Sequence, residues 1–330
     1  MASLCSLTSS PPAIASSVSR IQVVMIDVEA WSPEQLIVEN LLEHLQSEER
    51  QRVLRFRVEI DKLRSLVGRI LLRWMAHIAL RVPWERLDFQ RTEENKPYLS
   101  SPKRSCFNLN VSHHGKWVAG ACDERVLVGV DVMRYERPRG CSSIHDFFDT
   151  MRQYFTPYEW EDIEREPEVT CQDAPATTKT TTTTTTTTTE EEQKEDTQKE
   201  TTSPQEMLQL QQFYRHWALK ESYIKAVGIG LGFELSRCEF RYVDKESLVE
   251  LPNGKHAVMY IDGVLQTNWK FTIHEPDVEH CVVVALGPLK EATPHFLESL
   301  LPLPKNDPEN ECELDLEFVE KKVSQLRRKV

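Results

Sequence analysis

The stretch "VLVGVDVMRYE" (Val126–Glu136) is an apolar run that carries one aspartate, Asp131, and then becomes polar. A similar stretch, "IQVVMIDVEAW" (Ile21–Trp31), lies near the start of the chain and carries Asp27. Short apolar runs rich in β-branched residues and bounded by polar residues predict buried strands. Two such strands, each with an aspartate, indicate that the chain contains a repeated unit.

The segments that follow these two strands also correspond to each other, in the same order. In each half, a short helix with a Ser or Thr cap and acids in its first turn precedes a long amphipathic helix, and strands joined by turns come next. The matched segments are "HLQSEERQRVLRF" with "MRQYFTPYEWEDIE", "DKLRSLVGRILLRWMAHIAL" with "FYRHWALKESYIKAVGIGL", "RLDFQRTEENKPYL" with "RCEFRYVDKESLVELPNGK", and "FNLNVSHHGKWVAGAC" with "WKFTIHEPDVEHCVVVALG". This order predicts two similar α/β subdomains, with a functional site most naturally at the seam between them.

A threonine run followed by a charged run interrupts the second repeat. The run, Thr177–Gln205, has no periodicity and little to bury, so we expect a disordered insertion over about residues 168–205. The end of the chain, "CELDLEFVEKKVSQLRRKV", is interpreted as a short amphipathic helix outside the main fold. The predicted units are a disordered N-terminal tail (1–20), an N-terminal subdomain (21–125), a C-terminal subdomain (126–289) and a C-terminal tail (290–330).

The composition excludes several classes of function. A net charge of −12 over 330 residues disfavours nonspecific nucleic-acid binding, and no apolar run is long enough to cross a bilayer. The eight cysteines are scattered without a CxxC pair, which argues against a disulfide framework or a zinc site and favours a reducing cytosol. The Ser- and Ala-rich start, "MASLCSLTSSPPAIASSVSR", is interpreted as a disordered tail, with an organelle transit segment as the alternative.

Asp131 has two interpretations. An unpaired carboxylate inside an apolar strand is costly, so Asp131 needs a partner such as a metal ion. The alternative is an aspartate at a strand end that caps a turn, and Asp27 in the matching strand keeps that alternative open.

Glu221 lies in the helix "FYRHWALKESYIKAVGIGL", four residues before Lys225. An exposed ion pair between the two is the simpler interpretation. Trp217, one turn earlier, suggests instead that this side of the helix faces inward. Two carboxylates from different elements suit Mg²⁺, and Lys220 and Lys225 would then supply positive charge for phosphate oxygens.

Three polar stretches are further candidates for phosphate contacts, although each taken alone is more simply a solvated loop or helix face. Their candidate residues are Asn110, Ser112 and His113 in "NVSHHGKWVAGA", Arg91 and Lys96 around the turn at Asn95 in "QRTEENKPYL", and Arg52 in "EERQRVLRFR".

Together these motifs resemble the phosphopantetheinyl transferases, in particular the large, pseudo-dimeric, single-chain type. The family signature W-[AS]-x-K-E-[AS]-x-x-K is met from Trp217 to Lys225, downstream of "VGVDVM", and "QRTEENKP" and "NVSHHG" occur where the family has them. Within the family, the chain is most similar to the animal L-aminoadipate-semialdehyde dehydrogenase type. The resemblance covers about residues 21–286, apart from the insertion. It implies an α+β fold of two pseudo-twofold-related subdomains, each a small, mainly antiparallel sheet packed with helices.

The resemblance also implies the roles of the site residues. Asp131 and Glu221 would bind Mg²⁺ at the pyrophosphate of coenzyme A, with Glu221 and Lys225 as the catalytic pair. Many bacterial members have a third acidic ligand where this chain has Met133, so we expect water to fill that coordination position. The residues implied for the nucleotide end of coenzyme A are Arg52, Arg91, Thr92, Asn95, Lys96, Asn110, Ser112 and His113.

The expected reaction moves 4′-phosphopantetheine from coenzyme A to a serine of an apo acyl carrier protein domain, of the fatty acid synthase or aminoadipate-semialdehyde dehydrogenase type, and releases 3′,5′-ADP. We expect a cytosolic monomer that binds neither nucleic acid nor membrane. Arg134, Arg137 and Arg139 are candidates for docking an acidic carrier, or form a solvated basic loop. The alternative function is a catalytically inert scaffold that binds coenzyme A or carrier proteins.

Overall fold

The computed structural model describes residues 22–31, 35–102, 106–138, 140–141, 143–165, 203–243 and 255–300. The predicted N-terminal tail, most of the predicted insertion and the proposed helix at the end of the chain lie outside these residues. Among the helices that are described, none has both the length and the apolar character needed to span a membrane.

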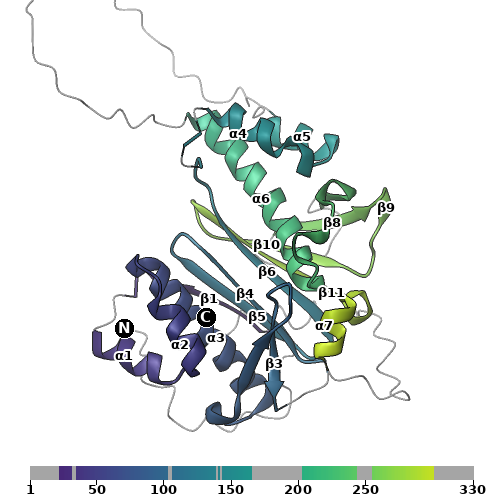
Figure 1. Ribbon diagram of the computed structural model, residues 1–330. Coiled ribbons are helices and arrows are strands. Elements are labelled where there is room, and N and C mark those ends of the chain that lie inside the picture. Colours follow the sequence, from purple (N-terminus) through teal and green to yellow (C-terminus); the bar gives the residue numbers. More distant parts are fainter. Residues whose placement is uncertain are drawn as a thin grey trace, which may run out of the picture.

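The N-terminal half contains one long helix packed on a small antiparallel sheet (Figure 1). Its sheet has the order β1-β5-β4, and β2 and β3 form a separate two-stranded ladder. Helix α3 lies on β4 and β5 and contributes Leu71, Leu72 and Met75 to the core. The elements are β1 (Gln22–Asp27), α1 (Gln35–Glu43), α2 (Ser47–Leu54), α3 (Glu59–Leu80), η2 (Trp84–Arg86), β2 (Asp88–Arg91), β3 (Pro97–Ser101), β4 (Asn108–His114) and β5 (Trp117–Asp123).

The C-terminal half has the same order of elements but a continuous sheet. The strand order is β6-β11-β10-β8-β7, with β9 paired to β8, and helix α6 packs on β6 and β11. The elements are β6 (Val126–Arg134), α4 (Ile144–Met151), η3 (Arg152–Tyr154), α5 (Pro157–Glu164), α6 (Pro204–Val227), η4 (Gly230–Gly232), η5 (Leu235–Arg237), β7 (Cys238–Val243), β8 (Lys255–Ile261), β9 (Val264–Leu265), β10 (Lys270–Asp277), β11 (His280–Pro288), η6 (Leu289–Glu291) and α7 (Pro294–Ser299).

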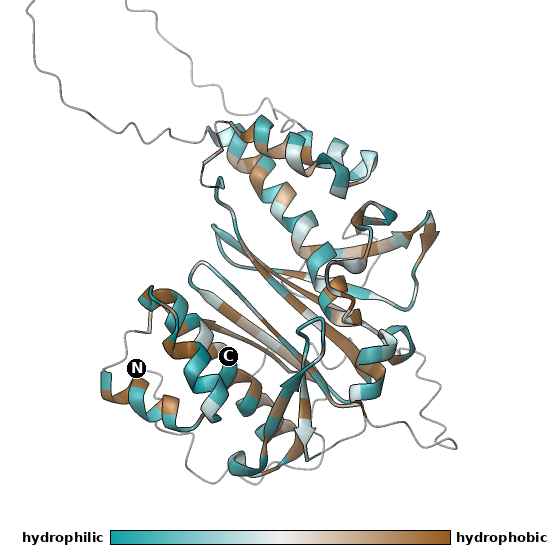
Figure 2. Ribbon diagram, in the orientation of Figure 1, coloured by the Kyte–Doolittle hydropathy of each residue, from teal (hydrophilic) through white to brown (hydrophobic). Residues whose placement is uncertain are grey.

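In each half the first strand pairs antiparallel with the last: β1 with β5, and β6 with β11. The predicted α+β fold of two related subdomains is therefore confirmed. Hydrophobic residues run along the strands and along the helix faces that cover them (Figure 2). The two halves differ at β2 and β3, which separate from the N-terminal sheet, whereas β7 and β8 continue the C-terminal one.

Capping residues set where helices begin. The structure differs from the sequence-based prediction at the starts of α2 and α6. Thr156 caps α5 in a capping box, as its sequence predicted. Ser47 is instead the first residue of α2, and Gln46 at the N-cap position makes no side-chain capping hydrogen bond. Ser203 forms a second capping box at the start of α6, ahead of Pro204. The helix therefore begins inside the range 168–205 that was assigned to the insertion.

The predicted tail also begins too early. The chain after β11 continues through η6 and α7, and Leu289, Phe296 and Leu300 are buried in the C-terminal core. Residues 290–300 therefore pack with the C-terminal half, because their apolar side chains cover the end of α6.

Helix α6 lies unusually close to strand β6. A Cβ atom at Gly129 would come within 1.9 Å of the carbonyl oxygen of Ser222 and 2.6 Å of the amide nitrogen of Ala226. Only glycine fits at this crossing. The close contact brings Asp131, two residues along β6, next to the helix that carries Glu221.

The two halves meet where β4 runs beside β6, and side chains make the bonds at this seam. Alternate side chains of β4 accept hydrogen bonds from alternate backbone amides of β6, because successive residues of a strand point to opposite faces. The bonds are Val128 N to Asn108 Oδ1 (2.9 Å), Val130 N to Asn110 Oδ1 (2.8 Å), Val132 N to Ser112 Oγ (3.3 Å) and Arg134 N to His114 Nδ1 (3.0 Å). We call this set the seam ladder.

Candidate active site

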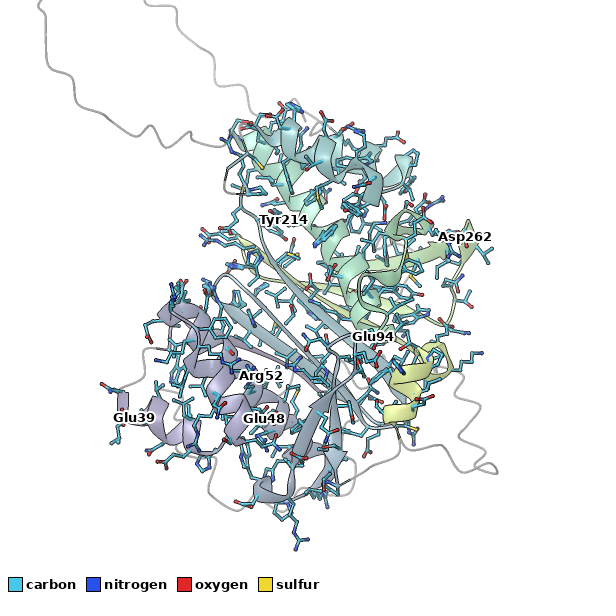
Figure 3. All side chains as sticks on the ribbon, in the orientation of Figure 1. Glu39, Glu48, Arg52, Glu94, Tyr214 and Asp262 are labelled. Carbon is cyan, nitrogen blue, oxygen red and sulfur yellow. The ribbon has the colours of Figure 1, made fainter. Side chains whose placement is uncertain are left out.

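A cleft of about 630 Å³ lies between the halves, as the repeated sequence predicted. It is bounded by α2, α3, the β2–β3 turn and β4 on the N-terminal side, and by α6 on the C-terminal side. The polar residues that line it are Arg52, Arg55, Arg64, Ser65, Arg69, Arg91, Glu94, Asn95, Lys96, Asn110, His113, Glu221 and Lys225. Arg52 lies on the N-terminal half and Glu94 between the halves in Figure 3.

Asp131 lies buried beneath this cleft, with only 1% of its surface exposed. Its Oδ1 accepts hydrogen bonds from Ser112 Oγ (3.0 Å) and Lys225 Nζ. Its Oδ2 is also buried and has no hydrogen-bond partner among the described residues. Since a buried carboxylate oxygen without a partner is costly, this atom fits a cation or a strong donor.

Asp27, at the matching position of β1, behaves differently. Its Oδ1 accepts hydrogen bonds from the backbone amides of Glu29 (3.0 Å) and Ala30 (2.9 Å), which cap the turn after the strand. Asp131 makes no such bond, so the turn-cap interpretation holds for Asp27 and not for Asp131.

Glu221 is half-buried on the face of α6 that borders the cleft. Within the described part of the chain it has no hydrogen bond and no ion pair, because Lys225 pairs with Asp131 instead. Burial raises the pKa of Glu221, the charge of Lys225 lowers it, and that of Asp131 raises it again. The surface Glu221–Lys225 pair is therefore not formed.

Lys220, the other candidate for phosphate charge, does not face the cleft. It is fully buried in the C-terminal core, where its Nζ lies 2.8 Å from Glu159 Oε2 and donates to the carbonyl oxygens of Leu235 and Cys238. Adjacent helical residues point about 100° apart. Lys220 therefore anchors α6 to the core, while Glu221 and Lys225 lie on the cleft side.

The β2–β3 turn forms the nucleotide side of the predicted site and is held by its own hydrogen bonds. Asn95 adopts the expected left-handed conformation (φ 70°), and its carbonyl accepts a bond from Arg91 Nη1 (2.8 Å). Thr92 does not line the cleft; its Oγ1 accepts a bond from Lys96 N (3.2 Å). These bonds hold the shape of the turn, which presents Arg91, Asn95 and Lys96 to the cleft wall.

Lys96 was predicted to contact phosphate, but its ammonium group is bound to backbone oxygens instead. Its Nζ is buried and donates to the carbonyl oxygens of Val128 (3.2 Å) and Lys225. Burial lowers the pKa of Lys96 to about 7. The ammonium group therefore ties the N-terminal turn to the C-terminal half, and the rest of the side chain forms part of the cleft wall.

On β4, the three predicted polar residues divide between the cleft and the seam. Asn110 and His113 line the cleft, whereas Ser112 lies beneath it against Asp131. Burial lowers the pKa of His113, and the nearby charges of Arg64 and Lys225 lower it further. A neutral imidazole at rest can gain a proton when an anion binds beside it.

The cleft holds more arginines than the sequence reading identified. Arg52 and Arg91 were expected, but Arg55, Arg64 and Arg69 line it as well. The pKa of Arg69 is lowered mainly by burial, and that of Arg91 by burial and by repulsion from Arg69 and Arg52. Concentrating like charges in a chain of net charge −12 points to a polyanionic ligand.

A helical-spacing signal for Arg69 was present in the sequence. Ser65, Gly68, Arg69 and Leu72 all line the cleft and are spaced i, i+3, i+4 and i+7 along α3. A face with this spacing that contains glycine, serine and arginine is a candidate ligand surface.

Arg134, in the expected docking loop, is paired with acidic side chains. Arg134 lies 3.6 Å from Glu136 Oε2 and 3.4 Å from Glu279 Oε2, so acids on both sides offset its charge. Arg137 has contacts of its own, and Arg139 lies outside the described residues. Arg134 therefore does not support the docking prediction.

The donor set fits Mg²⁺. Asp131 Oδ2 and the Glu221 carboxylate are oxygen donors without a protein partner in the described structure. No group of three His, Cys, Asp or Glu side chains suited to a metal occurs among the described residues. Two carboxylates leave the remaining positions to phosphate oxygens and water, which is how Mg²⁺ is commonly bound.

Sequence comparison defines the class of protein with this fold and cleft. Residues 29–125 match the family described as "4′-phosphopantetheinyl transferase, N-terminal", and residues 127–285 match the "4′-phosphopantetheinyl transferase superfamily". The chain belongs to the 4′-phosphopantetheinyl transferase superfamily and is a transferase. The resemblance inferred from its motifs is confirmed, and the relatives do not support the alternative of a catalytically inert scaffold.

Several curated proteins are similar over most of the chain. A phosphopantetheinyl transferase of Thraustochytrium sp. is 36% identical over 266 residues, which cover 81% of this chain and 78% of the relative. The L-aminoadipate-semialdehyde dehydrogenase-phosphopantetheinyl transferases of Xenopus laevis and Homo sapiens are each 34% identical. They cover 78% and 73% of this chain, and 73% and 67% of their own lengths.

Proposed function

We propose that this transferase moves 4′-phosphopantetheine from coenzyme A to a serine of apo acyl carrier protein domains and releases 3′,5′-ADP. The observation that carries the proposal is the pairing of the free Oδ2 of Asp131 with the carboxylate of Glu221, beside an arginine-lined cleft. Carboxylates that hold a cation and arginines that bind phosphates together suit a nucleotide pyrophosphate.

The residues of the chain divide the work of this reaction. Arg52, Arg69 and Arg91 bind and orient the phosphates at the nucleotide end, with the neutral His113 beside them. Lys225 stabilises the transferring phosphoryl group, and it exchanges its present partner, Asp131, for phosphate oxygens.

Asp131 and Glu221 would hold Mg²⁺, which when bound offsets charge on the pyrophosphate and on the departing ADP oxygen. Glu221 accepts the proton of the incoming serine hydroxyl. Its raised pKa makes it a stronger base than an exposed glutamate, which suits this role.

The fatty acid synthase and aminoadipate-semialdehyde dehydrogenase types of carrier are the proposed substrates. A single chain supplies every side of the cleft, which supports action as a monomer. The described cysteines are Cys106, Cys122, Cys141, Cys238 and Cys281, and all are free thiols, which supports the proposed cytosolic location.

The test is a transfer assay with the full chain. The protein is mixed with coenzyme A, Mg²⁺ and an apo carrier protein, and intact-mass spectrometry looks for the phosphopantetheine increment on the carrier, with EDTA as the control. An increment that EDTA abolishes supports the proposal. No increment on carriers of both types would contradict it.

A further inference from the structure

The segment after β11 covers the C-terminal end of α6. The backbone amide of Thr293 donates to the carbonyl oxygen of Val227 (2.9 Å), and Trp269 Nε1 donates to Glu291 Oε2 (2.6 Å). Phe296 of α7 is fully buried in the C-terminal core. The segment is thus fixed to the helix that carries Glu221 and Lys225.

The same short helix also contacts the N-terminal half. The Phe296 ring centroid lies 4.5 Å from Lys96 Nζ, and His295 Nδ1 lies 3.5 Å from carboxylate oxygens of both Glu93 and Glu94. These three partners belong to the β2–β3 turn. Figure 3 shows Glu94 beside α7, between the two halves.

The turn, α7 and the end of α6 come together at two glycines. A Cβ atom at Gly228 would lie 3.2 Å from Lys96 Cδ and 3.3 Å from Phe296 Cβ. A Cβ atom at Gly230 would lie 3.3 Å from Glu94 Cβ. The three elements therefore pack closely at this point of the cleft wall.

The contact between the β2–β3 turn and α7 depends on the aromatic ring of Phe296, which lies against the ammonium group of Lys96. A buried ammonium group is costly unless oxygens or an aromatic face offset the lost hydration. Two backbone carbonyls and the face of Phe296 offset part of this cost here. Without the ring, Lys96 would lose one of its partners and gain a cavity to move into.

We propose that α7 is a clasp that holds the β2–β3 turn against α6. Phe296 and His295 are then positioning residues for the nucleotide wall of the cleft, and they act through Lys96 and Glu94 without touching the reacting atoms. This inference rests on the proposed function, since it assumes that the wall binds the nucleotide of coenzyme A.

The experiment compares Phe296→Ala with Leu297→Ala, which changes the neighbouring, 39% exposed residue of the same helix. For Phe296→Ala we expect the KM for coenzyme A to rise roughly tenfold, with kcat within about a factor of two, because a displaced wall weakens binding more than chemistry. Phe296→Leu fills the cavity but has no aromatic face, so it should recover only part of the affinity, and Leu297→Ala should resemble the wild type.

Two further measurements do not depend on turnover. Amide hydrogen exchange of residues 92–96 should be faster in Phe296→Ala and in His295→Ala than in Leu297→Ala. Calorimetric titration with 3′,5′-ADP should show the same order of affinities as the KM values.

The clasp is overturned if exchange in the turn is unchanged in both variants, or if kcat falls while the KM stays constant. A wild-type protein that neither binds 3′,5′-ADP nor transfers phosphopantetheine would overturn the proposed function instead. The exchange measurement would still decide whether α7 holds the turn.

Discussion

Glu221 lowers the stability of the folded protein because its carboxylate is half-buried without a partner among the described residues, and this placement leaves the carboxylate open to the cleft. It is half-buried, lacks a partner in the described structure, and lies near a second carboxylate, Asp131. Its neighbour Lys225, which could have neutralised it on a helix surface, is pointed at Asp131 instead. A carboxylate placed in this way is available to a ligand.

We expect Glu221→Gln to bind coenzyme A but to lose turnover by roughly a hundredfold or more, because it removes the proton acceptor and a metal ligand. Single-turnover transfer and calorimetric binding measure the two effects separately. Glu161→Gln, on the exposed side of α5, is the matched control. Wild-type turnover in Glu221→Gln would remove this residue from the mechanism.

The same variant makes a prediction for stability. The pKa of Glu221 is raised in the folded state, so the folded protein binds its proton more tightly than the unfolded chain does. Its favourable contribution is complete below the unfolded pKa and is lost as the pH rises through the folded pKa.

Without Mg²⁺, Glu221→Gln should therefore be more stable than the wild type at pH 7, with the gain shrinking as the pH falls toward the ordinary carboxylate range. Urea unfolding at several pH values measures this. A constant difference in the free energy of unfolding across the pH range would contradict the raised pKa.

Arg69 tests the anion cleft at the same scale. Arg69→Met should weaken binding of 3′,5′-ADP by roughly tenfold, the size expected for a charge-assisted hydrogen bond, and should make binding less sensitive to salt. Arg86→Met, exposed and outside the cleft lining, is the control. Equal affinities for the two variants would show that Arg69 does not contact the ligand.

Among the elements, α6 has the largest share in the site. Its capping box fixes where it begins, Lys220 fixes its rotation, and its crossing at Gly129 fixes its distance from β6. These three constraints together set the position of Glu221 relative to Asp131.

Gly129→Ala should push α6 away from β6, since the new Cβ atom would overlap backbone atoms that cannot move alone. We expect a loss of roughly 1–3 kcal/mol in the free energy of unfolding together with loss of transfer activity. Gly232→Ala is the control, because its Cβ atom would meet nothing within 4 Å. A fully active Gly129→Ala would show that the helix tolerates displacement.

An element could be predicted from the sequence when the pattern that specifies it lies within a short stretch of residues. The strands β1 and β6 and the long helices α3 and α6 follow from hydrophobic periodicity, and the cap at Thr156 from a four-residue pattern. No short sequence pattern marks the separation of β2 and β3 from the N-terminal sheet, since it depends on how segments distant in the sequence pack together.

The site was predictable to a similar degree. The signature residues identified Glu221, Lys225 and Asp131, but not the direction in which Lys225 points. Arg55 and Arg64 enter the cleft only because α2 and α3 approach α6, a relation between distant segments. The role of α7 was missed for the same reason, because a few apolar residues such as Leu289, Phe296 and Leu300, spread between prolines and charged residues, resemble a linker.

At the scale of the whole molecule, the two halves are alike in topology but have separate tasks. The N-terminal half supplies the arginines of the cleft, and the C-terminal half supplies Asp131, Glu221 and Lys225. Neither half contains a complete site. The arrangement places five arginines of an acidic protein around one cleft.

The seam ladder bears on how such a molecule can change over time. Hydrogen bonds between two backbones survive almost any substitution, whereas this junction depends on Asn108, Asn110, Ser112 and His114 as acceptors. A point mutation can therefore remove one of these hydrogen bonds, and an insertion of one residue in β4 would turn the acceptors beyond it away from β6. The contact between the halves therefore depends on particular side chains. An N-terminal half taken from another protein would need the same acceptors on β4 to pair with β6.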